Sequence, residues 1–247
     1  MTPEKATGTA PRAGAPQAPG AGLPLRERKK LRTRQALVDT ALELFGEHGF
    51  DGVTLDRLCE AVEVSKRTFF RAFTSKEDVA MAPTQDLWAA FLVALEDRPP
   101  QGGGGRLVAV LEEALAEAID RMPADGWAER ALASRRLAAR TPSMDAHGLA
   151  FCERTTREAV ATIGRRFTLD GPAAGAALRA RLAVDMLVAA FHQAMDAWVA
   201  QPSGHTRADL AHRLRAACAE LPGALAATAG PRPAPTATPG PRHDRQG

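Results

Sequence analysis

The stretch from Thr54 to Asp78, TLDRLCEAVEVSKRTFFRAFTSKED, contains two short amphipathic patterns joined by a tight turn. Thr54 and Ser65 stand where the two helices would begin, and both residue types are favourable helix N-caps. Apolar residues follow each cap at three- and four-residue spacing. They are Leu55, Leu58, Ala61 and Val62 in the first pattern, and Thr68, Phe69, Phe70 and Phe73 in the second. The stretch therefore predicts a helix-turn-helix unit.

The residues just upstream supply a partner for these short helices, which cannot be stable alone in water. Residues 26–48, RERKKLRTRQALVDTALELFGEH, carry an apolar stripe from Leu31 to Phe45 that is wide enough to cover both short helices. Gly49 follows as a helix-ending glycine. The resulting three-helix arrangement would place the second short helix where it can enter a DNA major groove.

The distribution of charge supports a DNA partner more than the net charge does, which is only +3. Residues 26–34 carry six basic residues against Glu27, and residues 65–76 carry four basic residues and no acid. Residues 39–63, between them, carry seven acidic residues against Arg57. Basic side chains at these two places can neutralise phosphates and release counterions, so we expect binding to double-stranded DNA. Taken alone, residues 26–34 are equally consistent with a solvated helix start.

Residues 28–80 resemble the DNA-binding domain of the tetracycline-repressor (TetR) family of bacterial regulators. The matching pieces are ALELFGEHGFDGVTL, LCEAVEVS, SKRTFFRAF and SKEDV, in that order. The resemblance implies that Thr54 and Lys76 contact phosphates and that the second short helix lies in the groove. The full set of expected DNA contacts is Arg28, Lys29, Arg32, Thr54, Ser65, Lys66, Arg67, Thr68, Phe70, Arg71 and Lys76.

The chain departs from the family pattern at four positions. Glu63 stands where many members have a turn glycine, so the backbone there should adopt a conformation that a non-glycine residue tolerates. Phe70 replaces a frequent tyrosine and Ala72 a frequent histidine. Arg67 replaces a frequent glycine, and we predict that it reads a guanine, because arginine pairs bidentately with the major-groove edge of that base.

Between Ser75 and about Leu221 every substantial segment has helical periodicity, and none alternates like a strand. Breaks at residues 98–105, 122–126, 141–142, 168–172 and 202–204 predict about six helices. We therefore expect an all-α fold, with an N-terminal three-helix helix-turn-helix domain followed by a helical-bundle ligand-binding and dimerisation domain. The expected boundaries are a disordered tail at 1–24, the DNA-binding domain at 25–78, the bundle at 79–222 and a disordered tail at 223–247.

Large apolar residues are spread over the expected bundle, where most should form ordinary core and a minority should line a pocket. The candidate ligand-binding residues are Trp88, Phe91, Leu115, Trp127, Leu137, Phe151, Met186 and His192. A weaker resemblance, carried by RTFFRAF, SKEDV and ARTPSMDAH, is to the branch with mycofactocin-associated regulators. It implies an acyl-CoA-like effector and a basic pocket mouth. Arg135, Arg136 and Arg140 are candidates for this mouth, and they fit an exposed helix face equally well.

The TetR resemblance also implies a homodimer built on the last two long helices, at 173–200 and 207–221. An independent argument agrees, because one recognition helix reads too few base pairs, whereas a two-fold pair reads two half-sites. No apolar run reaches the length of a membrane span and no signal peptide is present, so we expect a cytoplasmic protein. Repression is the family default, and an activator or architectural DNA binder without a ligand is an alternative.

A small helical enzyme is the competing functional class. Asp185, His192 and Asp196 fall on one helix face, where they could serve as an acid-base or metal set. A solvated or subunit-facing stripe is the favoured interpretation, since no zinc spacing or nucleophile motif accompanies them. The glycine run at 102–105 lacks the features of a phosphate-binding loop, and Cys59, Cys152 and Cys218 should be free thiols. We expect neither catalysis nor a cofactor.

Pro83 falls inside the helix that should connect the two domains. A proline removes one backbone hydrogen bond and its ring clashes with the carbonyl of Val79. The sequence therefore predicts a kink or a restart there. We take Pro83 as a hypothetical hinge between effector and DNA-binding domain.

Overall fold

The computed structural model describes residues 24–99 and 106–230, and within these ranges it contains nine α-helices, one short 3-10 helix and no strand. The predicted all-α fold is confirmed for this part of the chain. Most of the expected tails and the glycine run at 102–105 lie outside the described residues. The helices are α1 Leu25–His48, α2 Leu55–Ala61, α3 Lys66–Ala72, α4 Lys76–Asp97, α5 Leu107–Arg121, α6 Trp127–Ala138, α7 Pro142–Arg166, η1 Ala173–Gly175, α8 Ala176–Ala200 and α9 Arg207–Ala226.

Local sequence signals set the ends of the short helices. Thr54 caps α2 by accepting a hydrogen bond from the backbone N–H of Arg57, and Ser65 caps α3 by accepting one from Thr68. Between the two helices, Glu63 has a φ of 55°, the left-handed region that the missing turn glycine would favour. Gly49 ends α1 with a φ of 75°. The predicted helix-turn-helix is therefore present.

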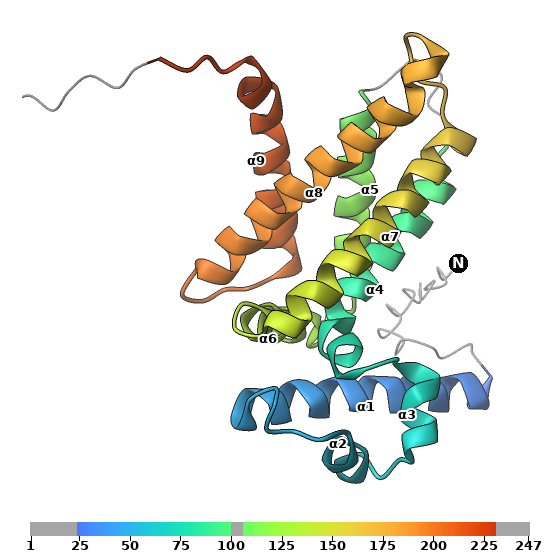
Figure 1. The fold of residues 1–247 in the computed structure, drawn as a ribbon, viewed down its shortest axis with the longest axis vertical. Coiled ribbons are helices and arrows are strands. Elements are labelled where there is room, and N and C mark those ends of the chain that lie inside the picture. Colours follow the sequence, from blue (N-terminus) through green and yellow to red (C-terminus); the bar gives the residue numbers. More distant parts are fainter. Residues whose placement is uncertain (1–23, 100–105, 231–247) are drawn as a thin grey trace, which may run out of the picture.

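Figure 1 shows α1 lying across one end of the α4–α9 bundle, with α2 on the far side of α1 and α3 beside it. A first hydrophobic core, built on Leu37, Phe45, Leu58 and Phe69, joins α1, α2 and α3. Leu31, expected at the start of the apolar stripe, is instead half exposed, because α1 begins before the helices that cover it. The long helices α7 and α8 run side by side through the bundle, where a second core lies.

The first core does not stop at the DNA-binding domain. It continues into the bundle through Val79 and Ala82 of α4, Leu137 and Ala138 of α6, and Met144 of α7. Packed interiors transmit displacement rather than absorb it, because they contain few voids. The two domains therefore share a packed boundary rather than a flexible linker.

The predicted restart at Pro83 is wrong, because α4 runs unbroken from Lys76 to Asp97. Pro83 is buried, and its carbonyl accepts a hydrogen bond from the indole N–H of Trp127 at 3.1 Å. Packing on this side holds the helix together where the proline removes a backbone donor. At the other end of the chain, α9 also passes through a proline, Pro222, and ends at Ala226 rather than at the expected Leu221.

None of the helices in residues 24–99 and 106–230 is long and apolar enough to cross a membrane.

Candidate nucleic-acid interface and ligand cavity

The exposed face of α3 carries the basic residues that the sequence indicates. Lys66, Arg67 and Arg71 are exposed, while Phe69 is fully buried beneath them. Phe70, expected on the apolar side, is 55% exposed, because the helix is only seven residues long and Phe69 and Phe73 fill its inner face. Phe70 therefore lies on the exposed face of α3, and its contact with DNA stays a prediction.

A groove of about 410 Å³ separates α3 from the basic start of α1. Its lining residues are Arg26, Glu27, Lys30, Thr33, Arg34, Thr68, Arg71 and Ala72. The four cations face one carboxylate, so the groove is electropositive and suited to a phosphate backbone. The expected contacts Arg28, Lys29 and Arg32 are exposed on the same helix start.

The side chains of α3 are not locked by strong partners. Lys66 forms an ion pair with Asp56 at 2.7 Å, but both groups are exposed, and such pairs contribute little stability. A phosphate can replace the Asp56 carboxylate at low cost. Arg67 and Arg71 make no hydrogen bond or ion pair within the described residues, so their guanidinium groups are available to DNA.

Thr54 and Lys76, the two phosphate contacts implied by resemblance, have structural roles as well. The Thr54 oxygen accepts the cap bond, which leaves its O–H free to donate. The Lys76 ammonium donates to the carbonyls of Phe50 and Val53 at 2.9 and 2.8 Å and lies 4.5 Å from the Phe50 ring centroid. Two of its three donors are thus engaged in holding the α1–α2 loop, and one remains for a phosphate.

The bundle contains a cavity of about 350 Å³ between α4, α6, α7 and α8. Its lining residues include Met81, Trp88, Arg135, Ala138, Met144, Asp145, Phe151, Cys152, Phe191, His192 and Met195. Such a volume and such an apolar lining with few polar groups are typical of small-molecule sites.

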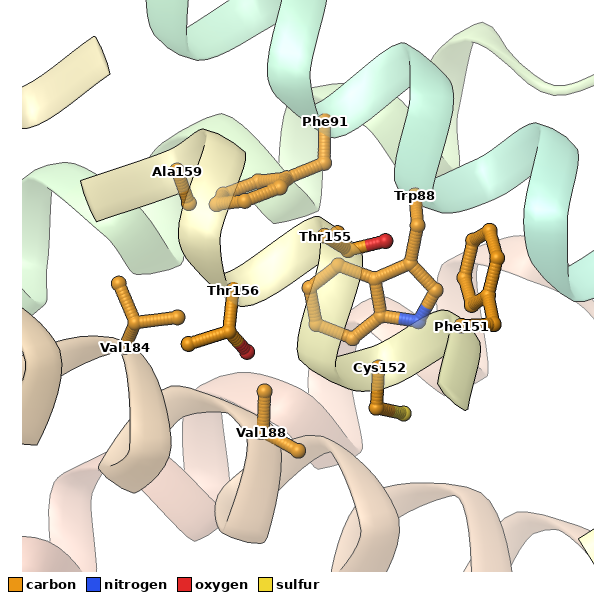
Figure 2. Close-up of a pocket in the computed structure, with 9 residues that line it drawn as sticks. All are labelled: Trp88, Phe91, Phe151, Cys152, Thr155, Thr156, Ala159, Val184 and Val188. Carbon is orange, nitrogen blue, oxygen red and sulfur yellow. The ribbon is translucent and has the colours of Figure 1, made fainter. Parts of the chain in front are cut away.

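A second, much smaller cavity of about 10 Å³ adjoins the first and is drawn in Figure 2. Trp88 of α4 and Phe151 and Cys152 of α7 line both cavities. Figure 2 shows the indole of Trp88 near the Phe91 ring, with Val184 and Val188 closing the other side. Rotation of these shared side chains would extend the larger cavity into the core.

The structure sorts the eight expected ligand-binding residues into two groups. Trp88, Phe151 and His192 line the larger cavity, and Phe91 lines the smaller one. Leu115, Trp127 and Leu137 are buried in the cores, and Met186 packs against one of them. Sequence periodicity marks all of them as inward-facing but cannot say where packing leaves a void. Of the candidate basic residues, Arg135 lines the cavity, whereas Arg136 and Arg140 are exposed outside it.

Two of the three candidate catalytic residues on α8 are engaged in ion pairs. Asp185 pairs with Arg181 at 3.0 Å and Asp196 pairs with Arg135 at 2.8 Å. His192 lines the cavity, where burial and then the neighbouring Arg135 lower the pKa of its imidazole. Within residues 24–99 and 106–230, no group of three or more His, Cys, Asp or Glu side chains could hold a metal ion.

The three cysteines are free. Burial, and secondarily the Glu112 carboxylate, raise the pKa of Cys218 to about 11. Burial also raises the pKa of the Cys59 and Cys152 thiols. Low thiolate content at neutral pH makes all three poor nucleophiles.

A polar cluster joins the start of α4 to the start of α7. Asp78 accepts hydrogen bonds from the Thr74 backbone N–H at 2.7 Å and from its hydroxyl at 2.9 Å, and its other oxygen lies 3.8 Å from Nε2 of His147. The same Nε2 lies 3.3 Å from the Gln85 amide nitrogen. The loop that follows α3 is thus held to the start of α4 by Asp78, whose carboxylate faces His147 on a helix that lines the cavity.

These features together define a helix-turn-helix DNA-binding protein with a second, cavity-bearing helical domain. Residues 37–82 match the family described as bacterial regulatory proteins, tetR family. The TcmR transcriptional regulator of Streptomyces glaucescens is 41% identical over 134 residues, which cover 52% of this chain and 56% of TcmR. That alignment is longer than the helix-turn-helix domain. Residues 37–82 therefore form a DNA-binding domain of the tetR family.

Two further comparisons are weaker. The mycofactocin biosynthesis regulator MftR of Mycobacterium tuberculosis, itself described as putative in its name, is 36% identical over 52 residues, covering 21% of this chain and 26% of MftR. This match is short, so the mycofactocin branch is only a partial relative. The structure of Salmonella enterica GusR superposes with a TM-score of 0.44 at 20% identity, covering 80% of this chain and 97% of GusR. This chain spans little more than half of TcmR and about a quarter of MftR.

Proposed function

We propose that the protein is a transcriptional repressor that binds a palindromic operator as a homodimer and is released by a small apolar effector. The observation that carries this proposal is the double role of Ala138 and Met144. Both residues line the 350 Å³ cavity, and both belong to the hydrophobic core of the DNA-binding domain. A molecule that displaces them acts directly on the packing beneath α1.

The route from cavity to DNA has two further links. Ser134 of α6, another cavity-lining residue, donates a hydrogen bond to the Ala80 carbonyl of α4 at 2.6 Å. On the opposite side, Arg34 of α1 forms a bidentate pair with Asp86 of α4, at 2.8 and 2.7 Å, and lies over the Phe73 ring. Movement of α4 is therefore passed to α1 and to the end of α3. A ligand shifts this equilibrium by as much as it prefers one arrangement over the other.

The homodimer is supported by the outer face of α8. Leu178 and Leu182 lie one turn apart and are 63% and 51% exposed. Two-fold pairing through such a face would set the separation of two recognition helices, which must be about 34–36 Å to read successive major grooves. We propose that α8 and α9 form the dimer interface. We also propose that the protein acts in the cytoplasm, which holds the bacterial chromosome.

The test is a fluorescence-anisotropy titration with the DNA upstream of the protein's own gene. We expect binding with a steep salt dependence, because counterions are released from the phosphates. We also expect weaker binding when the cavity is occupied. Failure to bind at moderate salt would contradict the regulator. Binding that no cavity ligand changes would favour the alternative of a DNA binder without an effector, and turnover of an added compound would favour the enzyme.

A further inference from the structure

The walls of the 350 Å³ cavity are aromatic on three sides. Trp88 comes from α4, Phe151 from α7 and Phe191 from α8. The Trp88 and Phe191 rings meet edge to face, with centroids 5.2 Å apart and planes at 78°. Aromatic rings prefer edge-to-face or offset contacts with other rings, and these contribute beyond the area they bury.

Three methionines form most of the remaining apolar lining, Met81 of α4, Met144 of α7 and Met195 of α8, and Leu149 is the single branched aliphatic side chain among the lining residues. Their thioethers contact aromatic rings favourably and adapt to irregular shapes. A lining of rings and thioethers favours a flat aromatic occupant. A flexible alkyl chain would pack equally well against branched aliphatic walls, so it gains nothing from this lining.

The charges of the cavity disfavour an ionised occupant. Among the residues that line it, Arg135 is the one guanidinium or ammonium, and it is already paired with Asp196 at 2.8 Å. Asp145 adds a carboxylate at the exposed side. Burial and then the neighbouring Arg135 lower the pKa of His192, which favours the neutral form of its ring. A phosphate or carboxylate would therefore compete with the Asp196 and Asp145 carboxylates for a single guanidinium, and transferring it from water would be costly.

The same polar groups suit a neutral molecule with hydroxyl and carbonyl groups. The neutral His192 ring offers one donor and one acceptor, Thr84 offers a hydroxyl, and Asp145 accepts. The volume is near the lower limit for small-molecule sites, so coenzyme A, with its nucleotide and phosphates, does not fit inside.

We propose that the effector is a compact, planar, uncharged aromatic molecule bearing hydroxyl or carbonyl groups, and not an acyl-CoA. The proposal rests on the cavity being the effector site of the proposed function. Trp88 and Phe151 contact its ring faces or edges, and His192 bonds its polar rim.

The test compares three probes by calorimetry on the full chain. They are chrysazin (a planar dihydroxyanthraquinone), decanol and decanoyl-CoA. We expect chrysazin to bind most tightly. Phe151→Leu, which keeps apolar bulk but removes a ring, should weaken chrysazin roughly 3- to 10-fold and leave decanol unchanged.

Phe167→Leu is the matched control. Phe167 is a partly buried phenylalanine like Phe151, follows the other end of α7, and lines neither cavity. It should change no probe's affinity. Cys152→Leu, which adds bulk inside the cavity, should weaken chrysazin without removing any ring, and thermal melts check that all three variants are folded.

Tighter binding of decanol or decanoyl-CoA than of chrysazin would overturn the proposal, as would equal effects of Phe151→Leu and Phe167→Leu. Operator release is scored separately. If chrysazin binds as expected but leaves DNA affinity unchanged, the effector response fails while the aromatic specificity of the cavity stands.

Discussion

Arg67 is exposed near the start of α3 and makes no ion pair in the described part of the chain, so we expect it to read a base. We predict that Arg67→Ala relaxes base preference at one position of each half-site. The loss against the preferred base should be about 1–3 kcal/mol, the contribution of a bidentate arginine–guanine contact. Anisotropy titrations on operators varied at single positions measure it.

Arg28→Ala supplies the comparison, since Arg28 is exposed on α1 and expected at a phosphate. It should weaken binding to all sequences alike and reduce the salt slope by about one. A uniform loss with Arg67→Ala as well would make Arg67 a phosphate contact instead.

Glu63 shows how a departure from a family pattern becomes a structural constraint. It holds a φ of 55° without being glycine, which is unfavourable for a side chain with a Cβ. We predict that Glu63→Gly stabilises the folded state by about 0.5–1 kcal/mol, partly offset by the greater freedom of glycine in the unfolded chain. Urea denaturation measures the change. Glu63→Val should be destabilising, and a loss of stability with glycine would contradict the strain argument.

At the scale of elements, the N-terminal part of α7 links the cavity to α4, the helix that follows α3. We predict that His147→Ala leaves operator affinity nearly unchanged but reduces the ratio of affinities measured without and with a cavity ligand. The reason is that His147 joins Asp78 and Gln85 of α4 to the helix that carries Met144 and Phe151.

Glu158→Ala is the control and should change neither quantity, because Glu158 is exposed on the same helix, lines neither cavity and makes no ion pair in the described part of the chain. The same ratio in wild type and His147→Ala would show that coupling passes elsewhere.

Pro83 has a different role in α4, where it interrupts the hydrogen-bond ladder without breaking the helix. A proline in a helix interior costs about 3 kcal/mol, and its neighbours here offset that cost by packing. We predict that Pro83→Ala, which restores a donor to the Val79 carbonyl, stiffens α4 and lowers the response to a cavity ligand. Pro222→Ala in α9 is the matched substitution and should not change that response. If Pro83→Ala alters neither DNA affinity nor ligand response, Pro83 is not a hinge.

Element ends were predictable because their signals are local. Thr54 and Ser65 cap helices through atoms three residues away, and breaks such as 122–126 contain proline and glycine. The continuity of α4 was not predictable, because Pro83 is buried against residues that are distant in the chain, among them Trp127, which is 44 residues away. The length of an element can therefore be decided by a contact that no sequence window contains.

At the scale of the whole molecule, the class of site could be predicted but its boundary could not. Sequence periodicity marks Leu137 and Phe151 equally as inward-facing, yet Leu137 lies in the shared core and Phe151 lines the cavity. A void exists where side chains from four helices fail to fill a space, which is a property of the assembled bundle. Ala138 and Met144 likewise belong both to the core and to the cavity wall, which only the three-dimensional structure shows.

The proposed homodimer is the whole-molecule property on which the proposed operator recognition would depend. We predict that Leu182→Glu, which places a carboxylate on the exposed apolar face of α8, shifts the protein to a monomer in sedimentation equilibrium. Desolvating an unpaired charge in an interface is costly, so association should weaken strongly. Operator affinity should fall steeply because one recognition helix then reads only one half-site.

Val93→Glu on α4 is the control for the added charge, because Val93 is 54% exposed and Leu182 is 51% exposed. It tests whether any exposed carboxylate would also dissociate the dimer. A dimer that survives Leu182→Glu, or that Val93→Glu disrupts equally, would place the interface elsewhere than on α8.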